Sequence, residues 1–307
     1  MKIAIAGATG FVGSRLVEKL NSEGHQVLVL TRNPQQAQRT FPDSAYSNVQ
    51  IKGYNPTESG DWQQALVGCD GVVNLAGVPI ADERWTAERK QAILQSRTLT
   101  TEKIVEGIAQ ANPRPSVLVS ASAVGFYGTS EAETFVETSN AGEGFLADVC
   151  QAWEAKAEQV KAVGTRLAIL RLGIVLDQDG GALAKMLTPF RLFAGGPLGS
   201  GEQWFSWIHR DDLVDLIIFC LQHPEVEGTL NATAPNPVRM SQLCNTLGQV
   251  MNRPSWLPVP GFALEALLGD AAQLVLEGQR VLPERTLAYN FEYKYPKVDQ
   301  ALREILD

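Results

Sequence analysis

The chain has 307 residues, of which 45% are hydrophobic and 20% are charged, and its formal net charge is -8. This length suits one large α/β unit or a nucleotide-binding domain with a smaller companion, and the composition excludes long disordered regions. Lysine and arginine are scattered, and no apolar run is long enough to cross a bilayer. We therefore expect neither a nucleic-acid partner nor a membrane partner.

Cysteine and histidine usage bounds the compartment and the metal chemistry. Cys69, Cys150, Cys220 and Cys244 are far apart and form no Cys-x-x-Cys pair, which indicates buried free thiols in a reducing compartment. The three histidines lack metal-ligand spacing, so we expect no metal site. The chain opens directly with a strand-like run that leaves no room for a signal peptide, and we expect a cytoplasmic protein.

Strands and helices alternate through the first two thirds of the chain. The apolar patterns predict, in order, a strand at 2–6, a helix at 11–22, strands at 26–30, 49–52 and 71–75, a helix at 88–110, a strand at 116–120, a helix at 145–163 and a strand at 167–172. This alternation is typical of a doubly wound parallel sheet, the α/β fold of Rossmann type.

The alternation weakens after Gly173. We expect a glycine-rich loop at 195–203, a helix at 211–222, a strand at 228–232, a helix at 241–251 and a closing segment at 298–306. These patterns favour a Rossmann domain over residues 1–173, with part of 205–235 returning to it, and a smaller C-terminal lobe over residues 174–307. Ligands of such sheets bind beyond the carboxyl ends of the strands, so we expect the site in a cleft between the two parts.

The turn after the first strand reads Gly7-Ala8-Thr9-Gly10-Phe11-Val12-Gly13. The first glycine allows a tight turn, the second lets a pyrophosphate approach the backbone, and the third lets the helix pack on the sheet. The helix N-terminus then offers free N–H groups to the phosphates. Because this motif lies between a strand and an amphipathic helix, it predicts a dinucleotide site formed by Gly7, Thr9, Gly10, Phe11, Val12 and Gly13.

The second strand ends before Arg32, where an NAD site usually carries an acidic residue. A guanidinium matches the geometry of a phosphate, so Arg32 favours NADP(H), although a solvated surface arginine is the alternative. Small residues after the fourth strand, Leu75, Ala76 and Gly77, fit either backbone contact with the cofactor or a simple exit from the strand.

Several motifs together resemble a known superfamily. GATGFVG at 7–13, NLAG at 74–77 and SASAVGFYG at 120–128 resemble the extended short-chain dehydrogenases/reductases. The stretches 195–213 and 267–296 are similar to atypical "epimerase family" proteins that carry a C-terminal domain of unknown function. Members of that group are named nucleoside-diphosphate-sugar epimerases or cell-division-inhibitor-like proteins. The resemblance implies an NADP(H)-binding Rossmann domain with a substrate lobe above the cleft, but no particular substrate.

The chain departs from the superfamily in its proton-transfer residues. The resemblance implies a serine together with Tyr-x-x-x-Lys on one helix face, where the tyrosine moves a proton while hydride passes to or from nicotinamide. Ser122 is the serine by this comparison, but Phe145 takes the tyrosine position and Val149 the lysine position. Neither of these side chains can transfer a proton.

Polar residues near the expected cleft are the remaining candidates for chemistry: Ser122, Tyr127, Glu154 and Arg97. Each also has a structural interpretation. Ser122 would be a loop hydroxyl bonded to backbone, Tyr127 a core or cleft-wall tyrosine, and Arg97 and Glu154 a buried ion pair between two helices.

The substrate side of the cleft also departs from the resemblance. Related nucleotide-sugar enzymes carry a diphosphate-binding arginine where Phe205 stands, next to Trp204 and Trp207. We expect either an aromatic wall for a flatter, less anionic small molecule or aromatic packing between the lobes, and His209 to orient this loop. Two functions follow: an NADP(H)-dependent oxidoreductase or epimerase without the usual pair, or a catalytically silent NADP(H)-sensing regulator with a protein partner, linked to cell or plastid division.

Overall fold

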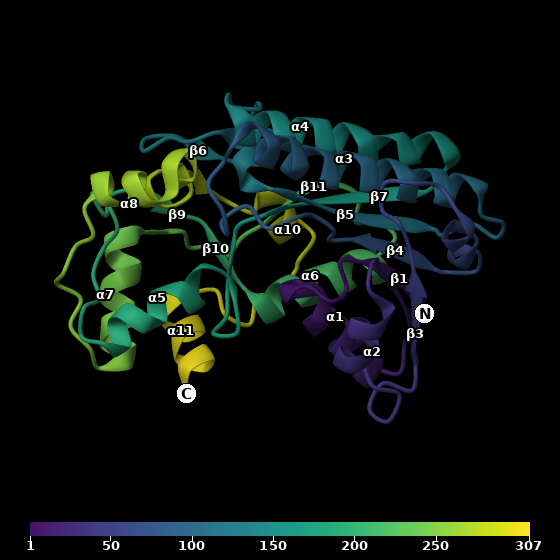
Figure 1. Ribbon diagram of the computed structural model, residues 1–307, viewed down its shortest axis with the longest axis horizontal. Helices are drawn as coiled ribbons and strands as arrows, with labels where there is room; N and C mark the ends of the chain where they lie inside the picture. Colours follow the sequence, from purple (N-terminus) through teal and green to yellow (C-terminus); the bar gives the residue numbers. More distant parts are fainter.

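A seven-stranded parallel sheet lies at the centre of the computed structural model, which describes all 307 residues (Figure 1). All but one of its strands contain consecutive buried residues, which explains their apolar runs, whereas the edge strand at 49–53 is only partly buried. In spatial order they are β11 (Gly228–Ala232), β7 (Arg166–Leu172), β5 (Val117–Ala123), β4 (Gly71–Asn74), β1 (Lys2–Ala6), β2 (Gln26–Thr31) and β3 (Val49–Gly53). The expected Rossmann-type sheet is confirmed, and β11 returns to it from late in the chain.

Helices cover both faces of the sheet (Figure 1). One face carries α1 (Phe11–Ser22), α2 (Pro34–Thr40) and α6 (Arg210–Gln222). The other carries α3 (Ala87–Gln110), α4 (Phe145–Glu158) and the short 3-10 helices η1 (Asp61–Leu66) and η3 (Gln159–Val163). Alternate residues of β1 supply the two cores: Ile3 and Ile5 pack with the first set of helices, while Ala4 and Ala6 pack with the second.

A smaller lobe adjoins the carboxyl ends of the strands. Its helices are α5 (Gly181–Arg191), α7 (Met240–Met251) and α11 (Val298–Leu306), and its short strand pairs are β8 (Ile174–Leu176) with β10 (Trp207–His209) and β9 (Trp204–Phe205) with β12 (Val238–Arg239). Phe190, Phe205 and Trp207 lie in its core against apolar side chains of α7 and α11. This core gives the lobe an apolar centre separate from that of the sheet.

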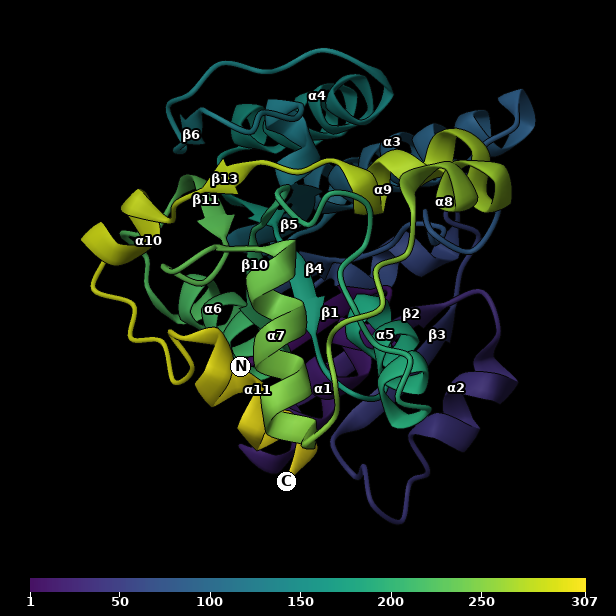
Figure 2. The ribbon, with the colours of Figure 1, turned by 90° about the vertical axis from the view of Figure 1, so that its left-hand side faces the viewer.

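The C-terminal strap, residues 273–283, runs across the carboxyl edge of the sheet (Figure 2). It lies within the segment α8 (Gly261–Leu268), η4 (Gly269–Ala272), α9 (Gln273–Leu276), β13 (Arg280–Val281) and α10 (Glu284–Ala288), and β13 pairs with β6 (Thr134–Phe135). Gln279 Nε2 donates to the carbonyl of Val124 at 2.8 Å in η2 (Val124–Tyr127), while Ser206 Oγ donates to the Gln279 carbonyl at 2.7 Å. The strap therefore ties the Rossmann part to the smaller lobe.

A few elements differ from the sequence prediction. The strand expected at 116–120 continues as β5 to Ala123, because its polar end still pairs with β7. The helix expected at 145–163 ends at Glu158 and continues as 3-10 turns. Helix α2 was not predicted, because its sequence PQQAQRT has no apolar period. No helix has the combination of length and hydropathy that a bilayer span needs, and all four cysteines are buried free thiols.

Candidate cofactor and active site

The glycine turn between β1 and α1 is sterically tight. Gly7 has φ +82°, and a Cβ built on it would lie 2.7 Å from the carbonyl carbon of Leu75. A Cβ on Gly13 would lie 2.2 Å from the Gly7 carbonyl oxygen. The backbone of Leu75 and Ala76 thus packs directly on the turn, and α1 packs on it from the other side. These contacts require glycine at positions 7 and 13.

Free N–H groups mark the start of α1. Gly10 is the N-cap and has no side chain to accept from the first helical turn, so these donors have no side-chain partner. Thr9 is exposed beside them. The turn and helix tip thus retain the donors that a diphosphate accepts from, which fits the predicted nucleotide.

Phe11 lies on the lobe-facing side of this turn. Cβ atoms built on Gly180 and Gly181, before and at the start of α5, would come within 2.8 and 3.3 Å of its ring. The Arg210 guanidinium lies 5.2 Å from the ring centroid. Phe11 therefore contacts the smaller lobe through its side chain, and only its backbone is available for a phosphate.

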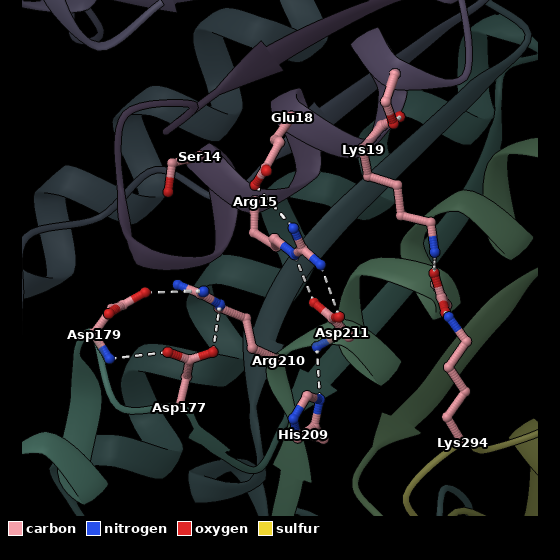
Figure 3. A network of polar contacts seen from close by, with 12 residues as sticks. Ser14, Arg15, Glu18, Lys19, Asp177, Asp179, His209, Arg210, Asp211 and Lys294 are labelled. Carbon is pink, nitrogen blue, oxygen red and sulfur yellow. Dashed lines mark hydrogen bonds and ion pairs between the residues drawn. The ribbon is translucent and has the colours of Figure 1, made fainter. Parts of the chain in front are cut away.

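Polar contacts hold α1 against α6 behind the turn (Figure 3). Arg15 donates to Asp211 through Nε at 2.7 Å and through Nη2 at 2.9 Å. The hydrogen bond from Arg15 holds the pKa of Asp211 below its usual value despite partial burial. His209 Nδ1 accepts from the Asp211 backbone N–H at 3.1 Å and caps α6. This residue orients the loop, as predicted, and burial lowers its pKa.

Arg32 follows the last residue of β2 and is exposed. No acidic side chain lies within 4 Å of its guanidinium, and none of its donors bonds to the protein. The neighbouring Asn33 is occupied, because its side chain caps α2 by accepting from Gln36 N–H at 3.1 Å. Arg32 is thus the charged group at this strand end that is free for a phosphate.

A buried polar chain starts at Ser122 and runs through the sheet. Ser122 Oγ donates to Glu154 Oε1 at 2.6 Å, and Arg171 donates to both oxygens of Glu154 at 2.8 Å. Arg171 Nη1 also donates to Tyr127 Oη at 2.9 Å, and Tyr127 donates to Asn231 Oδ1 at 2.6 Å. All five side chains are less than 10% exposed. The serine proton is therefore directed at a carboxylate, and Tyr127 lies inside the core rather than in the cleft wall.

The predicted ion pair between Arg97 and Glu154 is wrong. Glu154 pairs with Arg171 instead, because the parallel register of β5 and β7 places Arg171 beside Ser122, directly under α4. Arg97 donates only to two backbone carbonyls, those of Ile93 at 3.0 Å and Val78 at 3.3 Å.

The positions expected for tyrosine and lysine are part of an apolar cluster. Phe145 packs edge-on against Trp85 with ring centroids 5.2 Å apart, and Lys90 lies 5.5 Å from the Phe145 centroid. Val149 is buried among Trp85, Ile93 and Ala271. Positions 145 and 149 of α4 therefore supply no acid or base.

The aromatic segment at 204–207 is divided between two environments. Phe205 and Trp207 are buried in the core of the smaller lobe, and Trp207 Nε1 donates to the Asn236 carbonyl at 3.1 Å. Trp204 is half-buried, and Arg239 and Arg280 lie 3.9 and 5.2 Å from its ring centroid. Packing within the lobe accounts for two of the three aromatic residues.

Comparison with known proteins agrees with this geometry. The NAD dependent epimerase/dehydratase family matches residues 3–232, and a domain of unknown function, DUF1731, matches residues 259–305. The chain belongs to the NAD dependent epimerase/dehydratase family. The family resemblance read from the sequence is therefore confirmed over nearly the whole chain.

Individual relatives cover the full length. The chain is 50% identical to the chloroplastic epimerase family protein SDR39U1 homolog of Arabidopsis thaliana, over 100% of this chain and 87% of the relative. It is 38% identical to epimerase family protein YfhF of Bacillus subtilis, over 100% and 98% of the two chains. The crystal structure of human epimerase family protein SDR39U1 with NADPH has a TM-score of 0.86 and 33% identity, covering 99% of each chain.

Sequence reasoning missed three members of the buried polar chain in this family member: Arg171, Asn231 and Glu137, whose Oε1 accepts from the Asn231 backbone N–H at 3.0 Å. One signal was available in each strand. Arg171 and Asn231 are polar residues inside runs that otherwise read as buried strands, LAILRL and GTLNA. A buried charge requires a partner, so such a residue points to a buried pair.

Proposed function

We propose that this chain binds NADP(H) and acts as an oxidoreductase that lacks the usual Tyr-x-x-x-Lys pair. The exposed Arg32 at the end of β2, with no acidic residue beside it, carries the cofactor assignment. It stands where the ribose of the adenosine half lies when the diphosphate binds the glycine turn, so its guanidinium would bind the 2′-phosphate. The human relative crystallised with NADPH supports this choice.

A calorimetric titration tests the cofactor assignment. Charge-assisted hydrogen bonds contribute about 1.5–3 kcal/mol, so we expect NADPH to bind about tenfold to a hundredfold more tightly than NADH. Arg32→Ala should remove this difference and leave NADH affinity unchanged. Arg39→Ala is the matched control, because Arg39 is also exposed but lies in the last turn of α2, away from the end of β2. Equal binding of both nucleotides to the unaltered protein would contradict the assignment.

When bound, the nicotinamide would supply hydride to or accept it from a small-molecule substrate. The residues of this chain would bind and orient that substrate rather than supply the usual tyrosine proton. Ser122 holds its proton toward Glu154 at 2.6 Å, so its Oγ offers lone pairs only. Transfer of deuterium from 4-deuterated NADPH to a panel of aldehydes, ketones and sugars, followed by mass spectrometry, tests for hydride transfer.

A second function is favoured by the apolar cluster around Phe145 and Val149. We propose as the alternative a catalytically silent, cytoplasmic NADP(H)-sensing regulator with a protein partner, linked to cell or plastid division. Its support is that α4 packs these two positions into a core instead of presenting them to substrate. The regulator predicts no deuterium transfer to any compound and a set of captured proteins that changes when NADPH is added. A capture set unaffected by NADPH would remove this alternative.

A further inference from the structure

Arg97 is a half-buried cation with no acidic partner. It lies on α3, and no carboxylate is within 4 Å of its guanidinium. Its charge is therefore balanced differently from that of Arg171, which is bidentate on Glu154. An unpaired charge in a desolvated place is unfavourable, and burial indeed lowers the pKa of Arg97. The protein thus retains a cation here that no carboxylate of its own neutralises.

The guanidinium has unused donors. An arginine carries five N–H donors in a planar fork. Arg97 uses one on the Ile93 carbonyl and one on the Val78 carbonyl. Its Nε donates to no protein acceptor. This atom is not fully buried, so solvent can reach it. Three N–H donors of Arg97 therefore have no protein acceptor, and a two-oxygen contact would need two of them.

The position of Arg97 places this charge beside the segment that packs on the glycine turn. A Cβ built on Gly77 would lie 3.0 Å from the guanidinium carbon, so the segment that follows β4 passes directly over it. Its other side lies 5.3 Å from the ring centroid of Trp153 on α4. The same segment reaches the glycine turn through Leu75. The Arg97 guanidinium therefore lies between the segment that follows β4 and helix α4, beside residues expected to contact the cofactor or to form a simple exit from the strand.

The surroundings of Arg97 are mostly apolar, apart from the nearby Arg89, which is paired with Glu83 at 3.4 Å. Val78 and Ile80 from the loop after β4, and Phe145 and Leu146 from α4, are partly buried around Trp85 and Ile93. Lys90, the other cation near Phe145, is paired with Asp270 at 2.7 Å. A single open cation on an apolar wall suits a molecule with an apolar body and one acidic group.

We propose that Arg97 binds a carboxylate of the substrate, and that the substrate is a small organic acid with an apolar body. This inference rests on the proposed NADP(H)-dependent function, because it names the substrate class for the same cleft. The carboxylate would accept from the open donors of Arg97, and the apolar body would lie against the wall that includes Phe145 and Ile80.

The test uses 4-fluorobenzoate and its neutral counterpart 4-fluorobenzamide, followed by ¹⁹F line broadening with the full-length protein, with and without NADPH. We expect the acid to bind and the amide not to bind. Arg97→Gln should weaken the acid about tenfold or more. Arg114→Gln is the matched control, because Arg114 also donates only to carbonyls but lies beyond the opposite end of α3.

A second readout removes dependence on the folding of the glutamine variant. In the unaltered protein, the Nε–H resonance of Arg97, identified by its absence in Arg97→Lys, should shift when 4-fluorobenzoate is added. Equal broadening of acid and amide, or an unmoved Arg97 resonance, would overturn the proposal.

The cofactor titration keeps the two proposals apart. If NADPH binds but the acid does not, the carboxylate site is refuted and the cofactor assignment stands. If the acid binds through Arg97 but NADPH does not bind, the proposed function fails and the acid site stands. If Arg97→Gln weakens NADPH binding and the unaltered protein does not bind the acid, Arg97 contacts the cofactor and the proposal is wrong.

Discussion

The buried pair of Glu154 and Arg171 gives the sharpest test of the structure. Glu154 is 9% exposed and Arg171 is 5% exposed, and they share two hydrogen bonds of 2.8 Å. Arg171→Met leaves a buried carboxylate with Ser122 as its remaining donor. Breaking a buried pair from one side costs about 3–5 kcal/mol, because the other charge stays desolvated. We expect this loss for Arg171→Met and a similar loss for Glu154→Met.

The double variant distinguishes an ion pair from simple packing. Glu154→Met with Arg171→Met removes both charges, so the remaining loss is that of the partners of Ser122 and Tyr127, about 1–3 kcal/mol. The two substitutions should therefore be strongly non-additive. Urea unfolding followed by circular dichroism measures this. With a slope of about 3 kcal/mol per molar, each single variant shifts the midpoint by about 1–1.7 M.

A matched surface pair is the control for this experiment. Lys185 and Asp82 are 61% and 56% exposed in their side chains, so Lys185→Met should cost less than about 1 kcal/mol. A cost below about 1 kcal/mol for Arg171→Met, or losses that simply add in the double variant, would refute the buried pair as the link between α4 and the sheet.

Three further changes have defined outcomes. Gly13→Ala places a Cβ 2.2 Å from the Gly7 carbonyl oxygen. Calorimetry should show weakened NADPH binding, and thermal unfolding should show a free energy of unfolding lowered by about 1–3 kcal/mol. Unchanged binding would argue against this turn as the phosphate site. Tyr127→Phe leaves Asn231 Oδ1 without a donor, so it should lower the free energy of unfolding by about 1–3 kcal/mol and leave NADPH affinity unchanged. A selective loss of hydride transfer in a folded variant would instead assign Tyr127 a catalytic role. Burial lowers the pKa of His209 from 6.5, so the unfolded chain takes up the proton first and stability should fall as the pH drops below about 6.5. His209→Asn keeps an N-cap acceptor and should make the melting temperature less dependent on pH between about pH 7 and 5. A pH dependence as steep as that of the unaltered protein would exclude His209 as the titrating group.

Local patterns in the sequence determined the sheet, the cofactor turn and the family. Apolar patterns predicted all seven strands of the sheet, because the inner strands are buried and read as apolar runs, while the half-exposed edge strand β3 alternates apolar and polar residues. The glycine triplet was recognisable because backbone crowding at Gly7 and Gly13 acts within a single strand–turn–helix unit. Position after a strand was likewise enough to single out Arg32.

The tertiary structure alone decided which polar groups meet. Glu154 pairs with Arg171 and not with Arg97 because of the register between β5 and β7, a contact between strands that are separated by a whole helix. Tyr127 is buried against Phe135 and Val281, which come from distant parts of the chain, and its hydroxyl donates to Asn231 on β11. The tertiary structure also determines that Arg97 lacks an acidic partner, because the packing of α3 against α4 places no carboxylate beside it. Patterns within one element follow from local geometry, whereas partners across elements depend on how the sheet is assembled.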